Sequence, residues 1–280
     1  MSYFIDYHTH SQLSPDSSVP LEQQAEAAVR SGLSELCITD HYDTVGLHGS
    51  PMEPYDWAPA VEQFQRVRAQ FQGRLTLRLG LEFGSGHLDG SALAAAPPEL
   101  DFVIGSVHNR SLAAGGDDFY YGDYHSPGAC YQALDDYVSS LERLASAGAY
   151  DVLGHIIYPL RYMARGCPEV SMDRYADRIR VALSIAIASG RGMELNTYNG
   201  RRTWARASPK PMTSSAPPAS GTSRSTRGES RASSNCSIHL IQSGGITMIA
   251  LGSDHGGYAL KQHIIEYLDA HGLDYRDFGC

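Results

Sequence analysis

Histidine and acidic residues recur near the ends of apolar runs in the first 200 residues of the chain. His8 and His10 form an H-x-H motif, which places both imidazoles on one side of an extended strand because side chains alternate there. Glu82 lies inside an apolar run, where a buried carboxylate needs a hydrogen-bonding partner or a metal ion. Further residues of this kind are Asp6, Asp40, His41, His108, His155, Glu194 and Asn196. Converging imidazoles and carboxylates are ligands for zinc, manganese or iron, so the pattern predicts a multinuclear metal site.

Each residue taken alone has a simpler interpretation. His41 could cap a helix or satisfy a turn, and His108 or His155 could be an ordinary packed histidine. The joint pattern favours the metal site, because a histidine or an acid follows the predicted strands one after another along the chain.

The elements that would position these residues alternate between strands and helices. Short β-rich runs occupy residues 2–8, 34–41, 75–84, 100–109, 150–156 and 192–199. Helical patterns occupy residues 21–33, 57–73, 129–148 and 171–190. This alternation predicts an α/β fold with a parallel sheet. Six such units favour a barrel over an open sheet, and in a barrel all strand C-termini open on one face, where active sites lie.

Composition and charge limit which binding partners and which cellular compartment we expect for this chain. The net charge of −9 at pH 7 argues against a nucleic-acid partner. No apolar run reaches the roughly 18–20 residues needed to span a bilayer, so we expect no membrane partner. The N-terminal stretch MSYFIDYHTH has no basic region followed by an apolar run, and the five cysteines are widely scattered. We therefore expect a cytoplasmic protein without a disulfide framework.

Seven stretches of the chain match one known family in order and spacing. They are DYHTHS, SPDSS, CITDHYD, GLEFG, DFVIGSVH, DVLGHIIYPLRY and GMELNTYNGR. Over about residues 1–202 the chain resembles the PHP (polymerase and histidinol phosphatase) superfamily, in particular its stand-alone histidinol-phosphatases. The resemblance implies a distorted (β/α)7 barrel, a trinuclear metal site, and hydrolysis of L-histidinol phosphate to histidinol and phosphate in histidine biosynthesis. Another small phosphate remains an alternative substrate, because residues of the pocket decide it.

The resemblance also implies roles for individual residues. The implied metal ligands are His8, His10, Asp16, His41, Glu82, His108 and His155, holding two to three zinc, manganese or iron ions. Glu82 would bridge the first and second ions, whereas Asp16 and His41 would hold the third. Arg161 in YPLRY resembles the phosphate-binding arginine of the family, and a guanidinium suits phosphate oxygens. We expect Arg161 and His41 to be catalytic residues.

The pattern of strands and helices stops after residue 202. Between Thr203 and Ser237 the chain has no Leu, Ile, Val, Phe or Tyr. Such a segment cannot bury enough apolar area to offset its ordering entropy. We therefore expect a disordered linker over residues 203–245. Its composition is also typical of a GC-rich gene read in the wrong frame, so we interpret it as out-of-frame sequence.

Residues 246–280 again have a globular pattern, that of one short βαβ fragment. From Met248, and in the stretch GSDHGG, they resemble the N-terminus of type B ribose-5-phosphate isomerases. In the alternative interpretation, Asp254 and His255 are displaced metal ligands from the last strand of the PHP barrel. If they are not ligands, the barrel lacks its last metal motif, and an impaired, non-catalytic barrel is the alternative to an active phosphatase.

Overall fold

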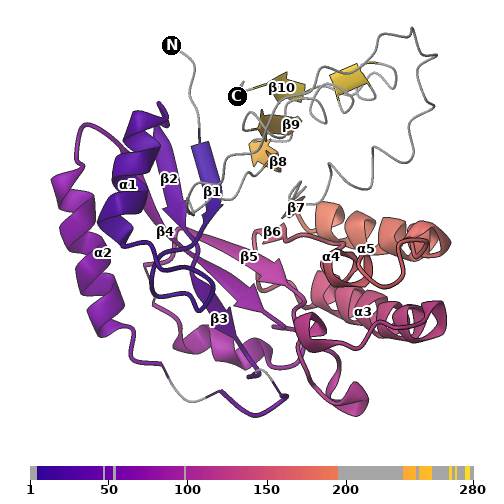
Figure 1. The fold of residues 1–280 in the computed structure, drawn as a ribbon. Helices are drawn as coiled ribbons and strands as arrows, with labels where there is room; N and C mark the ends of the chain where they lie inside the picture. Colours follow the sequence, from indigo (N-terminus) through magenta and orange to yellow (C-terminus); the bar gives the residue numbers. More distant parts are fainter. Residues whose placement is uncertain are drawn as a thin grey trace, which may run out of the picture.

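The computed structural model describes residues 5–46, 48–52, 55–97, 99–194, 236–243, 246–253, 265–266, 269 and 275–277. Strands and helices alternate up to residue 194 (Figure 1). The strands are β1 (Ile5–Thr9), β2 (Glu35–Ile38), β3 (His41–Asp43), β4 (Thr76–Gly84), β5 (Phe102–Ser106), β6 (Val152–Leu153) and β7 (Gly192–Met193). The α-helices are α1 (Leu21–Arg30), α2 (Ala58–Gln70), α3 (Pro127–Ala147), α4 (Leu160–Met163) and α5 (Ala176–Ala188). Short 3₁₀ helices are η1 (Gly90–Ala95), η2 (Leu112–Ala114), η3 (Phe119–Tyr121) and η4 (Asp173–Tyr175).

The main sheet is parallel and curls into part of a barrel. Its strand order is β1-β2-β4-β5-β6-β7, and β3 pairs with the second half of β4. Every pairing in this sheet is parallel. Helices α1 and α2 cover one part of the sheet, and α3 and α5 lie beside the other (Figure 1). The predicted α/β class with a parallel, barrel-type sheet is confirmed.

The predicted strand over residues 34–41 is divided into β2 and β3. The division follows from hydrogen bonds to the loop after β1: the Asp40 carboxylate accepts from the backbone N–H of Ser11 at 2.6 Å and from the Ser14 hydroxyl at 2.9 Å. These bonds turn the chain at Asp40, and β3 then pairs further along β4, with His41 opposite Glu82. For the strand predicted over residues 192–199, only Gly192–Met193 is a described strand, and residues 195–199 lie outside the described part.

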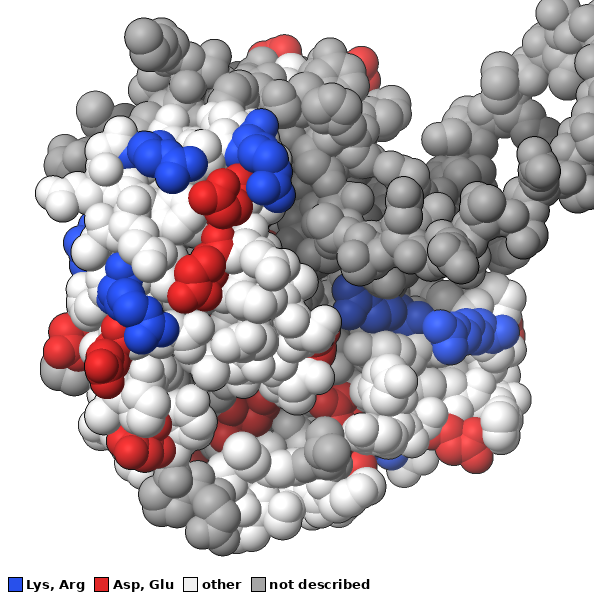
Figure 2. Space-filling model, turned by 60° about the vertical axis from the view of Figure 1, so that its left-hand side comes forward, with Lys and Arg blue, Asp and Glu red and all other residues white. Residues whose placement is uncertain are grey.

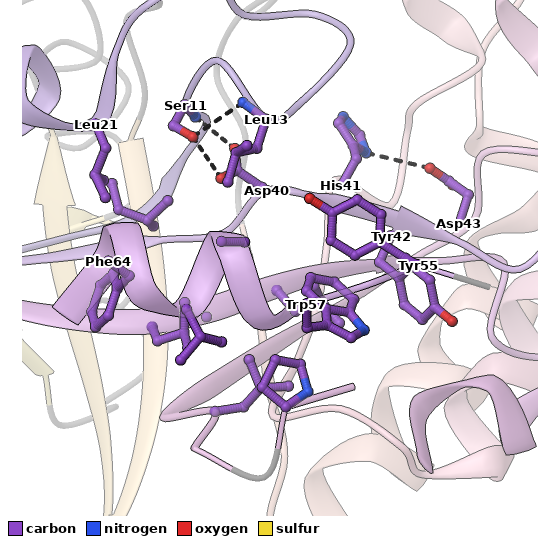
Figure 3. A pocket seen from close by; sticks show the side chains of 18 of the residues that line it. Ser11, Leu13, Leu21, Asp40, His41, Tyr42, Asp43, Tyr55, Trp57 and Phe64 are labelled. Atoms are coloured by element: carbon purple, nitrogen blue, oxygen red, sulfur yellow. Dashed lines mark hydrogen bonds and ion pairs between the residues drawn. The ribbon is translucent and has the colours of Figure 1, made fainter. Parts of the chain in front are cut away.

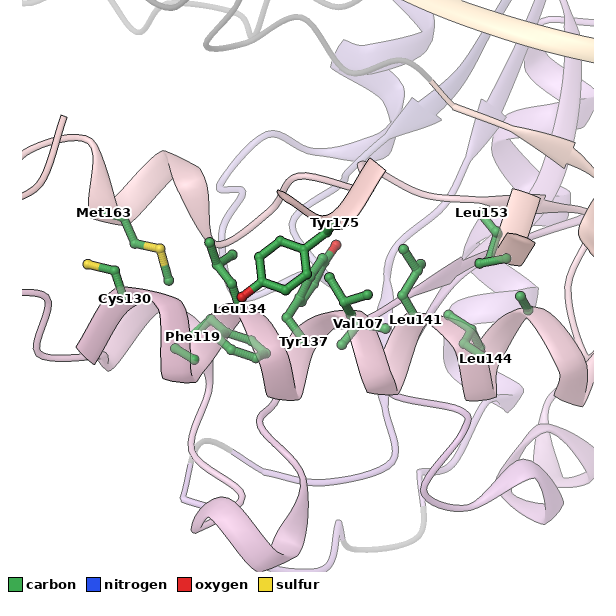
Figure 4. Close-up of a cluster of buried hydrophobic side chains, with 14 of the residues drawn as sticks. Val107, Phe119, Cys130, Leu134, Tyr137, Leu141, Leu144, Leu153, Met163 and Tyr175 are labelled. Carbon is green, nitrogen blue, oxygen red and sulfur yellow. The ribbon is translucent and has the colours of Figure 1, made fainter. Parts of the chain in front are cut away.

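The larger core lies between α3, α5 and the sheet (Figure 4). Helix α3 faces it with Leu134, Tyr137, Leu141 and Leu144, whose spacing forms one apolar stripe. Ser126 caps the start of this helix by accepting from the N–H of Ala129, and Gly148 ends it with φ 78°, a left-handed conformation that suits glycine. A second core, between α1, α2 and the strands β2 and β4, is made of residues such as Leu21, Ala25, Phe64, Val67 and Leu77.

A separate three-stranded sheet follows near the C-terminus. It consists of β8 (Cys236–Ser243), β9 (Ile246–Ser253) and β10 (Tyr275–Asp277), in the order β10-β9-β8. Strand β9 is antiparallel to β8 and parallel to β10. Residues 265, 266 and 269 are helical, within the predicted helix of the βαβ fragment. Residues 203–235 and the pair Asp254 and His255 lie outside the described residues, so the predictions for them and the isomerase resemblance stay predictions.

The prediction that the linker is disordered up to residue 245 is wrong for β8. This strand pairs with β9 along its whole length, from Cys236 opposite Ser253 to Ser243 opposite Ile246. Ile238, Leu240 and Ile241 suit a strand, and Gly244–Gly245 between two strand-like runs is a β-hairpin signal in the sequence.

The surface of the described residues carries both signs of charge. On the face shown in Figure 2, acidic and basic side chains lie next to each other and do not form a continuous basic strip. Ion pairs between α1 and the region of α2 contribute to this mixture, such as Arg66–Glu22 and Arg74–Glu26. Among the helices that the structure describes, none combines the length and apolar character needed to cross a membrane.

The stability of this fold should depend strongly on the stripe of α3. Leu141→Ala removes a side chain with 1% exposure from the core and should lower the free energy of unfolding by about 2–5 kcal/mol. The matched substitution Leu112→Ala changes a leucine that is 59% exposed and should cost less than about 0.5 kcal/mol. Urea unfolding followed by circular dichroism measures both. Equal losses for the two variants would contradict the assignment of this core.

Candidate metal centre

All seven predicted metal ligands lie close together at the C-terminal ends of the strands, with Glu82 at their centre. His8 lies on β1 and His10 directly follows it, His41 lies on β3 and Glu82 on β4. His108 and His155 follow β5 and β6, and Asp16 lies in the loop after β1. The parallel arrangement brings these ends to one side of the sheet. We call His8, His10, His41, Glu82, His108 and His155 the histidine cluster.

The carboxylate of Glu82 lies at the centre of the histidine cluster, and its side chain is only 1% exposed. Its Oε2 atom is 3.1 Å from Nε2 of His8 and 3.1 Å from Nε2 of His10. Nε2 of His41 is 3.5 Å from the same oxygen. Three imidazoles, from the end of β1 and from β3, therefore face one carboxylate oxygen.

The other oxygen of Glu82 faces a second set of groups. Its Oε1 atom is 3.1 Å from Nε2 of His108 and 2.7 Å from Nε2 of His155. The Ser106 hydroxyl donates to the same oxygen at 2.7 Å. The two oxygens of Glu82 thus face two separate sets of nitrogen atoms, which is the arrangement that a bridging carboxylate requires.

Two aspartates lie at the outer side of the cluster. Asp16 contacts Nδ1 of His10 at 3.0 Å, and its Oδ2 atom is 3.7 Å from Nε2 of His41. Asp43 lies 2.8 Å from Nδ1 of His108. Asp16 was predicted, whereas Asp43 was missed. The signal for Asp43 was present in the sequence, because the spacing of His41 and Asp43 puts both side chains on one face of a strand.

Glu194, directly after β7, lies on the far side of the His8 ring from Glu82. Its Oε1 atom is 2.7 Å from Nδ1 of His8, and its Oε2 atom accepts from the backbone N–H of His155 at 3.0 Å. Burial raises the pKa of Glu194, but the two histidines lower it to about 2. From the sequence, Glu194 is expected only as an acid at the end of a strand, without an assigned role.

The electrostatics of the cluster favour charged groups despite their burial. Burial raises the pKa of Glu82, but His41, His8 and His108 hold it well below its usual value. Burial lowers the pKa of His10, yet hydrogen bonds to Asp16 and Glu82 raise it to about 9. The pKa of His8 and of His108 is also raised, by the neighbouring carboxylates.

His155 differs from His8, His10 and His108 because its pKa is lowered. Burial dominates, and the effect of Glu82 does not outweigh it. The lowered pKa favours the neutral imidazole of His155, which is the form that binds a metal.

The chemistry of the donors fits divalent cations. Four groups of three residues have ligand atoms within 4.8 Å of one another. They are His8–His10–Glu82, Glu82–His108–His155, His10–Asp16–His41 and His41–Asp43–His108. In addition, Nδ1 of His41 and Nδ1 of His155 are buried without a hydrogen-bond partner in the described structure. Buried imidazole nitrogens without a partner next to carboxylates are the donor set that borderline metals prefer.

The remaining predicted residue, Arg161, lies on α4 and is half-buried. This helix begins five residues after His155, and the ring of Tyr158 between them is 5.1 Å from His108 and 5.2 Å from His155. The segment that carries Arg161 therefore adjoins the Oε1 side of the cluster. Asp254 and His255, the displaced ligands of the alternative interpretation, lie outside the described residues.

A cavity of about 320 Å³ lies between β3, β4 and α2 (Figure 3). Its lining includes Ser11, Asp40, Tyr42, Tyr55, Trp57 and Phe64. The Trp57 ring contacts Tyr42 at 5.0 Å and Tyr55 at 4.6 Å in edge-on geometry. His41 and Asp43 also line this cavity, so an apolar, aromatic space lies directly next to the histidine cluster.

Comparison with known proteins agrees with this fold. The model of the family described as PHP domain matches residues 6–198. A protein from Deinococcus radiodurans named "Probable histidinol-phosphatase" is 29% identical over 217 residues, covering 75% of this chain and 80% of its own. The histidinol-phosphatase of Lactococcus lactis is 26% identical over 201 residues, covering 69% and 71% of the two chains.

Among solved structures with a similar fold is the following one. It is a histidinol phosphate phosphatase from Lactococcus lactis, in complex with zinc, L-histidinol and phosphate. The TM-score is 0.57 and the sequence identity is 22%, and the match covers 70% of this chain and 74% of that one. The similarity supports the curled parallel sheet described above.

A histidine with buried ring nitrogens lies outside the histidine cluster. His87 follows β4, and both of its ring nitrogens are buried without a hydrogen-bond partner among the described residues. Burial, with a smaller effect of Arg143, lowers its pKa to about 4. His87 is therefore neutral in the folded protein at a pH where it would be charged in the unfolded chain.

This difference should make stability depend on pH between about 4 and 6.5. The folded pKa is below the unfolded value, so the contribution is complete above pH 6.5 and is lost as the pH falls toward 4. At about 1.4 kcal/mol per pKa unit, the shift corresponds to about 3 kcal/mol. His87→Gln should remove this part of the slope of unfolding free energy against pH, measured with a chelator present. The control His125→Gln changes an exposed histidine and should keep the slope; identical slopes for both variants would contradict the prediction.

Proposed function

The chain belongs to the PHP domain family, and we propose that it is a metal-dependent phosphomonoester hydrolase whose substrate is L-histidinol phosphate. The observation that carries the proposal is the buried Glu82 carboxylate, whose two oxygens face two separate sets of imidazole nitrogens. The names of the Deinococcus and Lactococcus relatives support the phosphatase activity and suggest the substrate. Histidine biosynthesis would be the corresponding pathway.

Two to three divalent ions would be held by this chain. His8, His10 and Glu82 would hold one ion, and Glu82, His108 and His155 would hold a second. Asp16 with His41 remains our proposal for the third, and Asp43 provides a further carboxylate at the same side. When bound, zinc, manganese or iron would lower the pKa of water and neutralise charge on the phosphoryl group.

The protein's own residues would bind and orient the phosphate. The guanidinium of Arg161 suits two phosphate oxygens at once, and its helix adjoins His108 and His155 through Tyr158. His41 is the proposed catalytic imidazole, because it lies between Glu82 and Asp16 at the open side of the cluster, with 17% of its side chain exposed. Glu82 itself is too deeply buried to reach a substrate and would act by holding the ions.

The proposal is tested by measuring bound metal and hydrolysis together. The purified chain is assayed with L-histidinol phosphate and with p-nitrophenyl phosphate, with and without added zinc or manganese. Metal-dependent hydrolysis that favours histidinol phosphate would support the proposal. Metal-dependent hydrolysis of p-nitrophenyl phosphate alone would indicate another small phosphate as the substrate. Absence of both activities from a metal-loaded, folded chain would favour the impaired, non-catalytic barrel.

Glu82→Gln should remove most of the bound metal and reduce hydrolysis at least about 100-fold, because a neutral amide cannot bridge two cations. Elemental analysis and the phosphatase assay measure the two effects. The control Glu35→Gln changes another buried carboxylate, which pairs with Arg78 and not with the cluster. It should keep its metal while losing stability. Full metal content in the Glu82 variant would contradict the bridging role.

Arg161→Ala should reduce hydrolysis by roughly 100-fold while leaving bound metal unchanged, because it removes a cation from the phosphate and not from the ions. The control Arg165→Ala changes an exposed arginine just after the same helix and should retain activity. Steady-state kinetics and elemental analysis measure the activity and the bound metal of both variants. Loss of metal in the Arg161 variant, or equal activity in both, would exclude the proposed role of Arg161.

A further inference from the structure

The two ends of the main sheet are linked through the side chain of Glu194. Strands β1 and β7 lie at opposite ends of the strand order. Glu194 follows β7 and is 2% exposed, and one of its oxygens contacts Nδ1 of His8 on β1 at 2.7 Å. The other oxygen accepts from the backbone N–H of His155, next to β6. A single carboxylate therefore joins one end of the sheet to the two strands at the other end.

The same contact decides which nitrogen of His8 faces the cluster. The Nδ1 atom points to Glu194, and the Nε2 atom lies 3.1 Å from Oε2 of Glu82. A carboxylate next to Nδ1 favours a proton on that nitrogen, which leaves the lone pair of Nε2 free for a metal. Glu194 belongs to none of the four donor groups, because it lies on the opposite side of the ring.

We propose that Glu194 is a positioning residue of the metal centre: it fixes the tautomer and the orientation of His8 through Nδ1 and holds the backbone of His155 beside it. The inference rests on the proposed metal-binding function. The role of Glu194 differs from those of Asp16 and Asp43, because both aspartates belong to donor groups and would contact an ion directly. Glu194 acts through His8 and does not touch the ion.

The substitution Glu194→Gln separates this role from a purely structural one. The glutamine side chain has the same length, and its carbonyl oxygen can still accept from the N–H of His155. Its NH₂ group then faces Nδ1 of His8 and can only donate, which favours the tautomer with a proton on Nε2. That tautomer has no lone pair toward the cluster. The variant thus keeps the link to His155 and changes the proton position on His8.

The test uses Co²⁺ as the probe, added to chelator-treated protein and followed by its visible absorption in competition with a chelating dye. Glu194→Gln should bind Co²⁺ about 10–100-fold more weakly than the unaltered chain. Thermal unfolding in the presence of a chelator should change little. The control Glu35→Gln should show the reverse, lower stability with unchanged Co²⁺ affinity, because its carboxylate pairs with Arg78 away from the cluster.

A double-mutant cycle with His8→Ala shows whether Glu194 acts through His8. In the His8→Ala background, the effect of Glu194→Gln on Co²⁺ affinity should fall below about twofold. The same loss in both backgrounds, or unchanged affinity in Glu194→Gln, would overturn the inference. If Glu194→Gln does not fold, Glu194→Asp, which is one methylene shorter, replaces it in the cycle with the same expectation. Failure of the unaltered chain to bind Co²⁺ would instead count against the proposed function.

Discussion

Burial of one carboxylate determines the arrangement of the strand ends. An ionised carboxylate loses its hydration when it is buried and must regain comparable interactions from the protein. Glu82 regains them from five imidazoles and one hydroxyl, supplied by β1, β3, β5 and the residues that follow β1, β5 and β6. These groups reach the same point only if the strands end at the same level, so the strand register and the site depend on each other. In the observed register, His41 lies directly opposite Glu82.

Close packing around Glu82 also restricts the neighbouring backbone. Gly84 lies two residues further along β4, on the same face as Glu82. A Cβ atom at this position would collide with the carboxylate of Asp43 and would lie 2.7 Å from Nδ1 of His108. Only glycine leaves room for the contact between these two side chains, which is 2.8 Å long. The glycine in the stretch GLEFG therefore serves the site and not a turn.

The sequence was sufficient to predict the parallel sheet and the convergence of the histidines, because both follow from local patterns: alternating strands and helices, and polar residues at strand ends. It was not sufficient for features that depend on tertiary contacts. The division between β2 and β3 results from serines in another loop that bind Asp40. The contact of Glu194 with His8 joins residues 186 positions apart. Strand β8 was missed for a different reason. Its hairpin pattern is local and visible in the sequence, but the serine-rich composition of the preceding residues favoured a disordered segment.

Side chains, and not backbone pairing, connect the two ends of the main sheet in the described part of the chain. In the described strands, β1 and β7 end the order of the sheet without pairing with each other, and β8 lies beside both, with Cα atoms within 8 Å (Figure 1). The contacts of Glu82 and Glu194 with His8 connect β1 to β4 and β7 instead. An ion bound by His8 and Glu82 would strengthen this connection, because it would attract groups from both strands. Metal binding and closure of the sheet would then be coupled, since binding energy that favours the closed arrangement also stabilises the fold.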